Sequence, residues 1–247
     1  SGRNGFLILT GKIAVNDNRI LRISDALREY NRLQQEQAAE SGSTAPVIQY
    51  RDGLPVNSIW AVPSLGIDPV SGEEIFVNTA GNLVNVWSAS NLAFCGSSDN
   101  LYNGNFSISG EWKGFGINAV CTYYGGGYKY NTTLVNKVEN VYIGDNVDRR
   151  IYSSRWYYKG QVAQYRNGKD DPTQATSRFV QRDNVLNISS VSIYYEFPQK
   201  LISKARLSRL RLTLLANDLY TFSSIEIERG TSYPYARTFS FSVSATF

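Results

Sequence analysis

The last nine residues of the chain alternate strictly between apolar and polar side chains, and this pattern constrains the fold more than any other feature. The odd positions are apolar and the even ones are serine or threonine: Phe239, Phe241, Val243, Ala245 and Phe247 against Ser240, Ser242, Ser244 and Thr246. A period of two places successive side chains on opposite faces of a β-strand. The segment therefore predicts a strand with one apolar and one polar face.

Similar alternation recurs upstream and predicts an all-β chain. The dipeptide Lys113-Gly114 separates two alternating segments and favours a hairpin. The segment 184–197 changes phase near Ser189-Ser190, which predicts a β-bulge at that point. Altogether the sequence predicts six antiparallel strands, at 6–16, 104–112, 115–125, 184–197, 207–219 and 235–247.

The connections between these strands are unequal in length. Those at one end are short, at 113–114 and 198–206, and those at the other end are long, at 17–103, 126–183 and 220–234. Outer-membrane barrels combine short periplasmic turns with longer extracellular loops. Aromatic residues also gather near the strand ends, at Trp112, Phe115, Phe197 and Phe247 on the short-turn side and at Tyr123, Tyr220, Phe222 and Tyr235 toward the loops.

We therefore interpret the chain as part of an antiparallel transmembrane β-barrel with long extracellular loops. The alternative is a secreted β-sandwich that binds carbohydrate or acts as an adhesin. Six strands do not close a barrel, since about eight is the smallest number known, and the chain contains no Met. Both observations favour a C-terminal barrel portion over 1–247, and they leave open a truncated gene or a split barrel.

The composition argues against several classes of enzyme and binding protein. With no His among 247 residues, His-based triads and His-ligated zinc are excluded. The net charge of +4 does not indicate nucleic-acid binding. Cys95 and Cys121 are interpreted as unpaired thiols, the run 125–127 as a flexible strand end, and the pairs Glu73-Glu74 and Asp170-Asp171 as loop charges. We predict no enzyme activity, no cofactor and no metal site.

A series of motifs runs through most of the chain, at 20–27, 64–76, 112–115, 128–140, 146–150, 177–181 and 212–220, and ends in Tyr233-Pro-Tyr-Ala-Arg-Thr-Phe239 and the terminal Phe247. Together and in this order, these motifs resemble the C-terminal part of the SusC/RagA-like TonB-dependent outer-membrane transporters. The TonB box, the plug domain and the earlier strands of that family's barrel, which has about 22 strands, have no counterpart here.

The resemblance implies energy-coupled import of glycan oligosaccharides or peptides across the outer membrane. It also implies the family's partners, which are a SusD-like surface lipoprotein that covers the barrel and the TonB complex, acting through the missing N-terminal region. The barrel wall would contact outer-membrane lipid. Alone, a piece of barrel is not expected to transport.

The barrel interpretation assigns roles to two groups of residues. Arg209 and Arg211 should face the lumen, where water or acidic groups of a plug can satisfy them; on the lipid face each would cost about 2–4 kcal/mol at the midplane. The alternating Phe239, Phe241, Val243 and Phe247 resemble the signal by which outer-membrane barrels are recognised for assembly.

The long loops are the segments that could contact a substrate or a lid. A short helix is predicted over 24–40 with Ser24 as its N-cap, and a loop hairpin over 58–78. Aromatic side chains in the loops could stack on a substrate or a lid, or could anchor the loops to one another: Trp60, Trp87, Trp156, Tyr157 and Tyr158.

Overall fold

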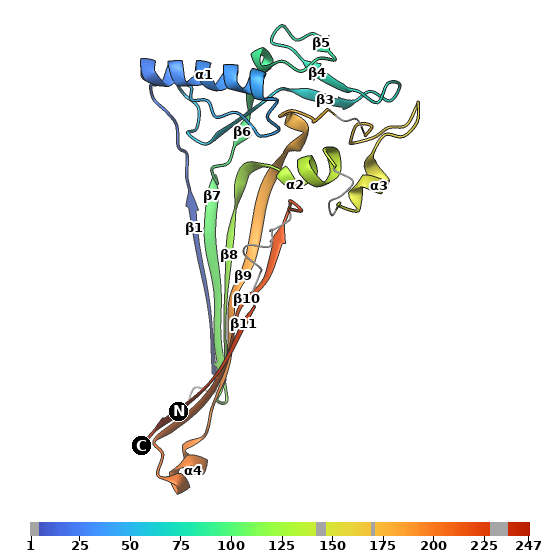
Figure 1. Cartoon of the computed structure of the whole chain (residues 1–247). Coiled ribbons are helices and arrows are strands. Elements are labelled where there is room, and N and C mark those ends of the chain that lie inside the picture. Colours follow the sequence, from blue (N-terminus) through green and yellow to red (C-terminus); the bar gives the residue numbers. More distant parts are fainter. Residues whose placement is uncertain (1–4, 142–146, 169–170, 228–236) are drawn as a thin grey trace.

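In the computed structural model, most of the regular structure lies in one long sheet of six antiparallel strands (Figure 1). The structure describes residues 5–141, 147–168, 171–227 and 237–247. In their order across the sheet, the strands are β1 (Gly5–Val15), β7 (Tyr102–Trp112), β8 (Phe115–Tyr130), β9 (Val180–Glu196), β10 (Arg209–Ser223) and β11 (Thr238–Thr246). The antiparallel β prediction is confirmed. The sheet is open, with β1 and β11 as its edges.

The register of the sheet collects apolar side chains on one face. Directly opposed residues share a face, and one row across four strands consists of Ile117, Ile193, Leu214 and Phe241. These side chains are exposed, from 44% at Ile117 to 67% at Phe241. The adjacent row on the other face consists of Asn118, Ser192, Leu215 and Ser240, which is mostly polar.

Aromatic rings border the apolar face at both ends of the strands. At the short-turn end, the ring centroids of Phe115 and Tyr195 lie 4.4 Å apart, and those of Tyr195 and Phe197 lie 4.9 Å apart. At the loop end, Tyr102 and Tyr123 stack with centroids 5.6 Å apart. The apolar face is therefore a band bounded by aromatic side chains.

Two irregularities that the sequence predicts are present. Lys113 and Gly114 both have positive φ, 50° and 86°, as a two-residue type I′ hairpin turn requires. Beyond the turn, Val120 pairs with Ser190 and Cys121 pairs with Ile188, so that the β9 residue between the two partners is a bulge. This bulge keeps the apolar residues of β9 on one face.

The glycine run 125–127 lies inside a strand and not at its end. The pairing of β8 with β9 shifts between Tyr124 and Gly127, and Gly126 has a φ of +82°. Glycine adopts positive φ at little cost, so the strand bulges there and continues to Tyr130. The prediction that this strand ends at 125 was therefore wrong. Residues 235 and 236 of the last predicted strand, with Tyr235, lie outside the described residues.

The connections at the loop end pack together into a structure that we call the cap (Figure 1). Its longest helix, α1 (Asp25–Ser41), begins at Ser24, whose hydroxyl accepts a hydrogen bond from the Leu27 amide, as predicted. The loop hairpin predicted within 58–78 is formed by β3 and β4. The remaining cap elements are β2 (Ser58–Ala61), β3 (Ser64–Ile67), β4 (Glu74–Val77), β5 (Leu83–Val84), η1 (Ala89–Asn91), β6 (Ala93–Ser97), α2 (Thr132–Leu134), η2 (Val135–Glu139), α3 (Arg150–Ser154) and η3 (Ser177–Phe179).

The cap holds most of the buried apolar side chains. One cluster surrounds Phe179 and Val138, and a second surrounds Trp60 and Val62, all four with at most 1% exposure. At the opposite end of the sheet lie the hairpin turn, the short helices α4 (Gln199–Ile202) and η4 (Ser203–Ala205), and the two chain ends (Figure 1). No helix in the described part of the chain is long and apolar enough to span a membrane.

A buried ion network ties the cap together. The Arg178 guanidinium contacts the carboxylates of Glu74 and Glu139, and Thr173 also donates a hydrogen bond to Glu139. The side chains of Glu74 and Glu139 are 4% and 0% exposed, and Glu74 lies on strand β4, so its interpretation as a loop charge was wrong. Asp170, in the other predicted carboxylate pair, lies outside the described residues.

Candidate functional site

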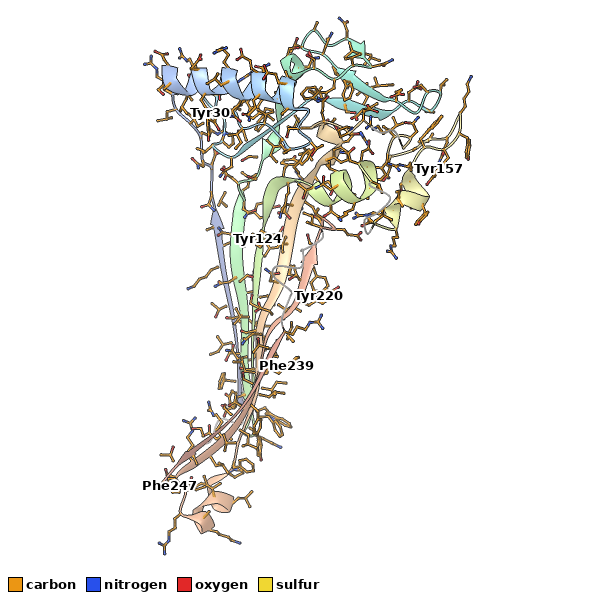
Figure 2. The ribbon with its side chains drawn as sticks, viewed as in Figure 1. Tyr30, Tyr124, Tyr157, Tyr220, Phe239 and Phe247 are labelled. Atoms are coloured by element: carbon orange, nitrogen blue, oxygen red, sulfur yellow. The ribbon has the colours of Figure 1, made fainter. Side chains whose placement is uncertain are left out.

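At the loop end of the sheet, the polar face opens into a cavity of about 1080 Å³. The ends of β8, β9 and β10 form one wall, and the segments that follow β8 and β10 form the other. Tyr124 and Tyr220 lie on the wall strands, below the cap (Figure 2). The lining is completed by Lys129, Thr133, Lys137, Val147, Asp148, Arg150, Asp183, Val185, Thr221, Phe222, Ser223, Ile225, Glu226 and Ile227.

Three of the charged lining residues form ion pairs with one another. The Arg150 guanidinium lies 2.7 Å from an Asp148 carboxylate oxygen and 3.5 Å from a Glu226 carboxylate oxygen. Its hydrogen bonds to Asp148 raise the pKa of Arg150 and lower the pKa of the Asp148 carboxyl. Arg150 and Asp148 are therefore ionised near neutral pH, and their ion pair orders this part of the cavity wall.

Three other charged side chains line the cavity without an ion-pair partner among the described residues. Lys129 and Asp183 come from neighbouring strands, since Lys129 pairs with Gln181 and Gly127 pairs with Asp183. Lys137 comes from η2. Unpaired charges of both signs in a partly enclosed space can form charge-assisted hydrogen bonds with a ligand that carries both signs.

Arg209 and Arg211 lie on the polar face, as the alternation predicts, but near the short-turn end. Both bind Glu196, at 2.8 Å and 2.6 Å. The Arg211 guanidinium also stacks on the Tyr194 ring at 4.1 Å from its centroid, and the Tyr194 hydroxyl donates a hydrogen bond to Glu111. Groups of the sheet itself therefore satisfy both arginines.

The five loop aromatics predicted as substrate or lid contacts differ in how deeply they are buried. Trp60 is 1% exposed, and its indole N–H donates to the Gln49 carbonyl, so it anchors the cap core. Trp87 and Trp156 are partly buried and donate to the carbonyls of Ala175 and Pro69. Tyr157 and Tyr158 are exposed at 56% and 67%. None of the five lines the cavity described above.

The residues of the predicted assembly signal lie on the edge strand and at the chain terminus. Phe239, Phe241, Val243 and Phe247 are exposed at 65%, 67%, 58% and 90%. Figure 2 shows Phe239 and Phe247 along the lower part of the sheet, away from the cap. The first three share one face because their partners on β10 are Ala216, Leu214 and Leu212.

The charged cavity residues Lys129, Lys137 and Asp183 are not among the predicted site residues. The predicted strand ends at 125, before Lys129, and η2 lies within the predicted connection 126–183. The sequence pattern that could identify Lys129 is a lysine on a strand that continues beyond a glycine bulge. Its pairing with Gln181 depends on a register shift that the local pattern does not reveal.

No protein-family model matches the sequence, and no curated protein matches it. Solved structures do match in fold. A structure of the RagAB peptide transporter aligns at TM-score 0.70 with 18% identity over 91% of this chain, and the RagAB peptide importer in its open-open state at 0.70 with 16% identity over 93%. The closed-closed state aligns at 0.65 with 16% identity over 91%. In each case the match spans 24% of the transporter chain. The protein thus has the fold of about a quarter of these transporter chains.

Proposed function

We propose that the chain forms part of the barrel wall of an outer-membrane, TonB-dependent importer of the SusC/RagA type. The observation that carries the proposal is a two-faced sheet. One face is an exposed apolar band between aromatic borders, and the other is polar and opens into a charged cavity. The structural similarity to the RagAB transporter supports it. In this proposal the apolar face contacts lipid, the cap faces the exterior, and the sheet takes part in transport, not catalysis.

The dimensions of the band agree with a membrane span. From Phe115 to Tyr123, strand β8 contains nine residues. A tilted transmembrane β-strand needs about 9–11 residues. The edges β1 and β11 would pair with further strands of the barrel, because unpaired backbone groups in lipid cost several kcal/mol each.

We propose a peptide rather than a neutral oligosaccharide as the cargo. Peptides carry terminal and side-chain charges of both signs, which Lys129, Lys137 and Asp183 can bind directly. A neutral sugar offers hydroxyl groups to these side chains but no opposite charges, so its hydrogen bonds to them would be weaker than those of a charged peptide group. A SusD-like lipoprotein would close the cavity from outside, and the TonB complex would act on a plug domain.

Replacing Lys129 and Lys137 together by Gln should reduce uptake of an acidic peptide about tenfold or more, because a hydrogen bond to a charged group contributes about 1.5–3 kcal/mol. Uptake of a fluorescent acidic peptide by cells that produce the complete transporter measures the effect. Lys159→Gln, which removes an exposed cap charge outside the cavity lining, is the control. Import of a neutral oligosaccharide without import of peptides would contradict the proposed cargo.

Cysteine labelling tests the membrane location. Cys121 lies on the apolar face opposite Phe106, so a charged maleimide should not label it in intact membranes and should label it after denaturation. Burial raises the pKa of the Cys95 thiol and slows its reaction. In a Cys121→Ser background, Ser107→Cys on the polar face should be labelled in membranes. Equal labelling of the two positions, or recovery of the protein in the soluble fraction, would argue for the secreted β-sandwich.

A further inference from the structure

The connection between β9 and β10, at the end of the sheet opposite the cap, is strongly basic. From 197 to 217 the sequence contains five Lys or Arg residues and no Asp or Glu. The connection contains α4 and η4 and ends in Arg206, whose φ of 58° reverses the chain. A hydrogen bond from the Phe197 amide to the Leu210 carbonyl, 3.0 Å long, closes its base.

Two of these five cations have an ion-pair partner, and among the described residues the other three have none. Arg209 and Arg211 bind Glu196 on the polar face. Lys200, Lys204 and Arg206 are exposed and have no ion-pair partner within the described ranges. The hairpin turn carries a further cation, Lys113, over the ring of Trp112 at 4.6 Å. The Glu196 amide donates to the Gly114 carbonyl, so the two turns are adjacent.

Apolar side chains accompany these cations. Ile202 is 5% exposed and fixes the connection, whereas the preceding Leu201 is 63% exposed. The short-turn aromatic border begins directly before the connection, at Tyr195 and Phe197. An exposed leucine among lysines, continuous with an aromatic border, is the composition of a segment that lies at a membrane interface.

We propose that this turn binds the headgroups of anionic phospholipids in the leaflet on the short-turn side. The inference rests on the membrane location proposed above. Lys200, Lys204 and Arg206 would contact the headgroup phosphates, and Leu201 would enter the acyl boundary. Basic residues near an anionic membrane surface each contribute to binding, and their contributions add within a Debye length.

A lipid surface explains the connection better than an acidic protein partner does. A protein partner would account for the charges, but the cations directly follow the aromatic border of the apolar band. In a membrane barrel the aromatic border marks the membrane interface, where the lipid headgroups lie, and the adjacent acyl boundary accommodates the exposed Leu201. The bound lipid would hold the sheet at a fixed depth in the membrane.

The test compares lipids that stay bound to the complete protein. The protein is placed in nanodiscs of phosphatidylethanolamine with a minor fraction of phosphatidylglycerol, transferred to mild detergent, and analysed by native mass spectrometry. The wild type should retain phosphatidylglycerol preferentially. The triple variant Lys200→Gln, Lys204→Gln, Arg206→Gln should lose that enrichment about tenfold or more. Lys204→Gln alone should give an intermediate loss.

The matched control removes three exposed charges from the cap, through Arg22→Gln, Arg149→Gln and Lys159→Gln, and should keep the enrichment. Absence of enrichment in the wild type, or equal enrichment in both triple variants, would overturn the inference while leaving the proposed function intact. The inference would also be overturned if the triple variant of the turn kept its lipid but lost binding to an acidic protein. Recovery of the wild type outside the membrane fraction would instead overturn both.

Discussion

The Arg178→Gln substitution should destabilise the cap by about 3–5 kcal/mol, which is the cost of removing one partner from a buried ion pair. The Arg178 side chain is 9% exposed, and its Nη2 lies 2.8 Å from Glu74 and 2.7 Å from Glu139. Burial acts to lower the pKa of Arg178, but the hydrogen bonds and charges of the two carboxylates outweigh this and raise it. Glutamine would leave the buried Glu74 carboxylate without a cation and Glu139 with only Arg166, whose Nε lies 3.6 Å away.

The effect should be local to the cap, because Arg178 joins the loop hairpin, η2 and the segment before β9. Hydrogen exchange should show lost protection in β4 (Glu74–Val77) and η2 (Val135–Glu139), with little change in the middle of the sheet. Arg32→Gln is the matched control, since Arg32 forms its ion pairs with Glu29 and Glu36 on the exposed surface of α1.

A second comparison separates the lost cation from simple loss of packing. The triple variant Arg178→Gln, Glu74→Gln, Glu139→Gln removes the buried carboxylate charges together with the cation. It should recover part of the lost protection, because neither buried carboxylate stays charged and Arg166 keeps its ion pair with Asp171. Exchange in Arg178→Gln that matches Arg32→Gln would show that the network does not stabilise the cap.

The sheet could be predicted because the residues that determine its strands and turns lie close together in the sequence. A period of two fixes the face of each residue, and the Lys113-Gly114 dipeptide specifies its own turn. The phase change near Ser189 locates the bulge without knowledge of the partner strand. Helix α1 could be predicted for the same reason, since Ser24 and Gly42 define its ends within one segment.

The cap and the cavity could not be predicted, because their contacts join residues far apart in the sequence. Glu74 and Arg178 are 104 positions apart, and no local pattern marks them as partners. Trp60 is an aromatic residue in a long predicted loop, which favours a binding role, but its burial depends on the loops that fold over it. Lys129 reaches the cavity only because β8 continues after the bulge at Gly126.

The two faces of β11 should respond oppositely to the same substitution. Phe241 lies opposite Leu214, in the apolar row between the two aromatic borders, and Ser242 lies opposite Thr213 on the polar face. In a membrane barrel, arginine on the lipid face costs about 2–4 kcal/mol near the midplane, whereas the lumen hydrates it. Phe241→Arg should therefore strongly reduce the amount of assembled protein in the outer membrane, and Ser242→Arg should leave it nearly unchanged.

The heat-dependent gel mobility of the complete protein in isolated outer membranes measures this difference. Each variant adds one arginine to the same strand, so a general effect of charge or of strand propensity would lower both equally. Equal assembly of the two variants would mean that neither face contacts lipid. Loss in Ser242→Arg alone would invert the assignment and place the charged cavity on the lipid side, where Lys129, Lys137 and Asp183 could not be hydrated. Loss in Phe241→Arg alone ties the apolar band to the membrane and the cavity to the transport path.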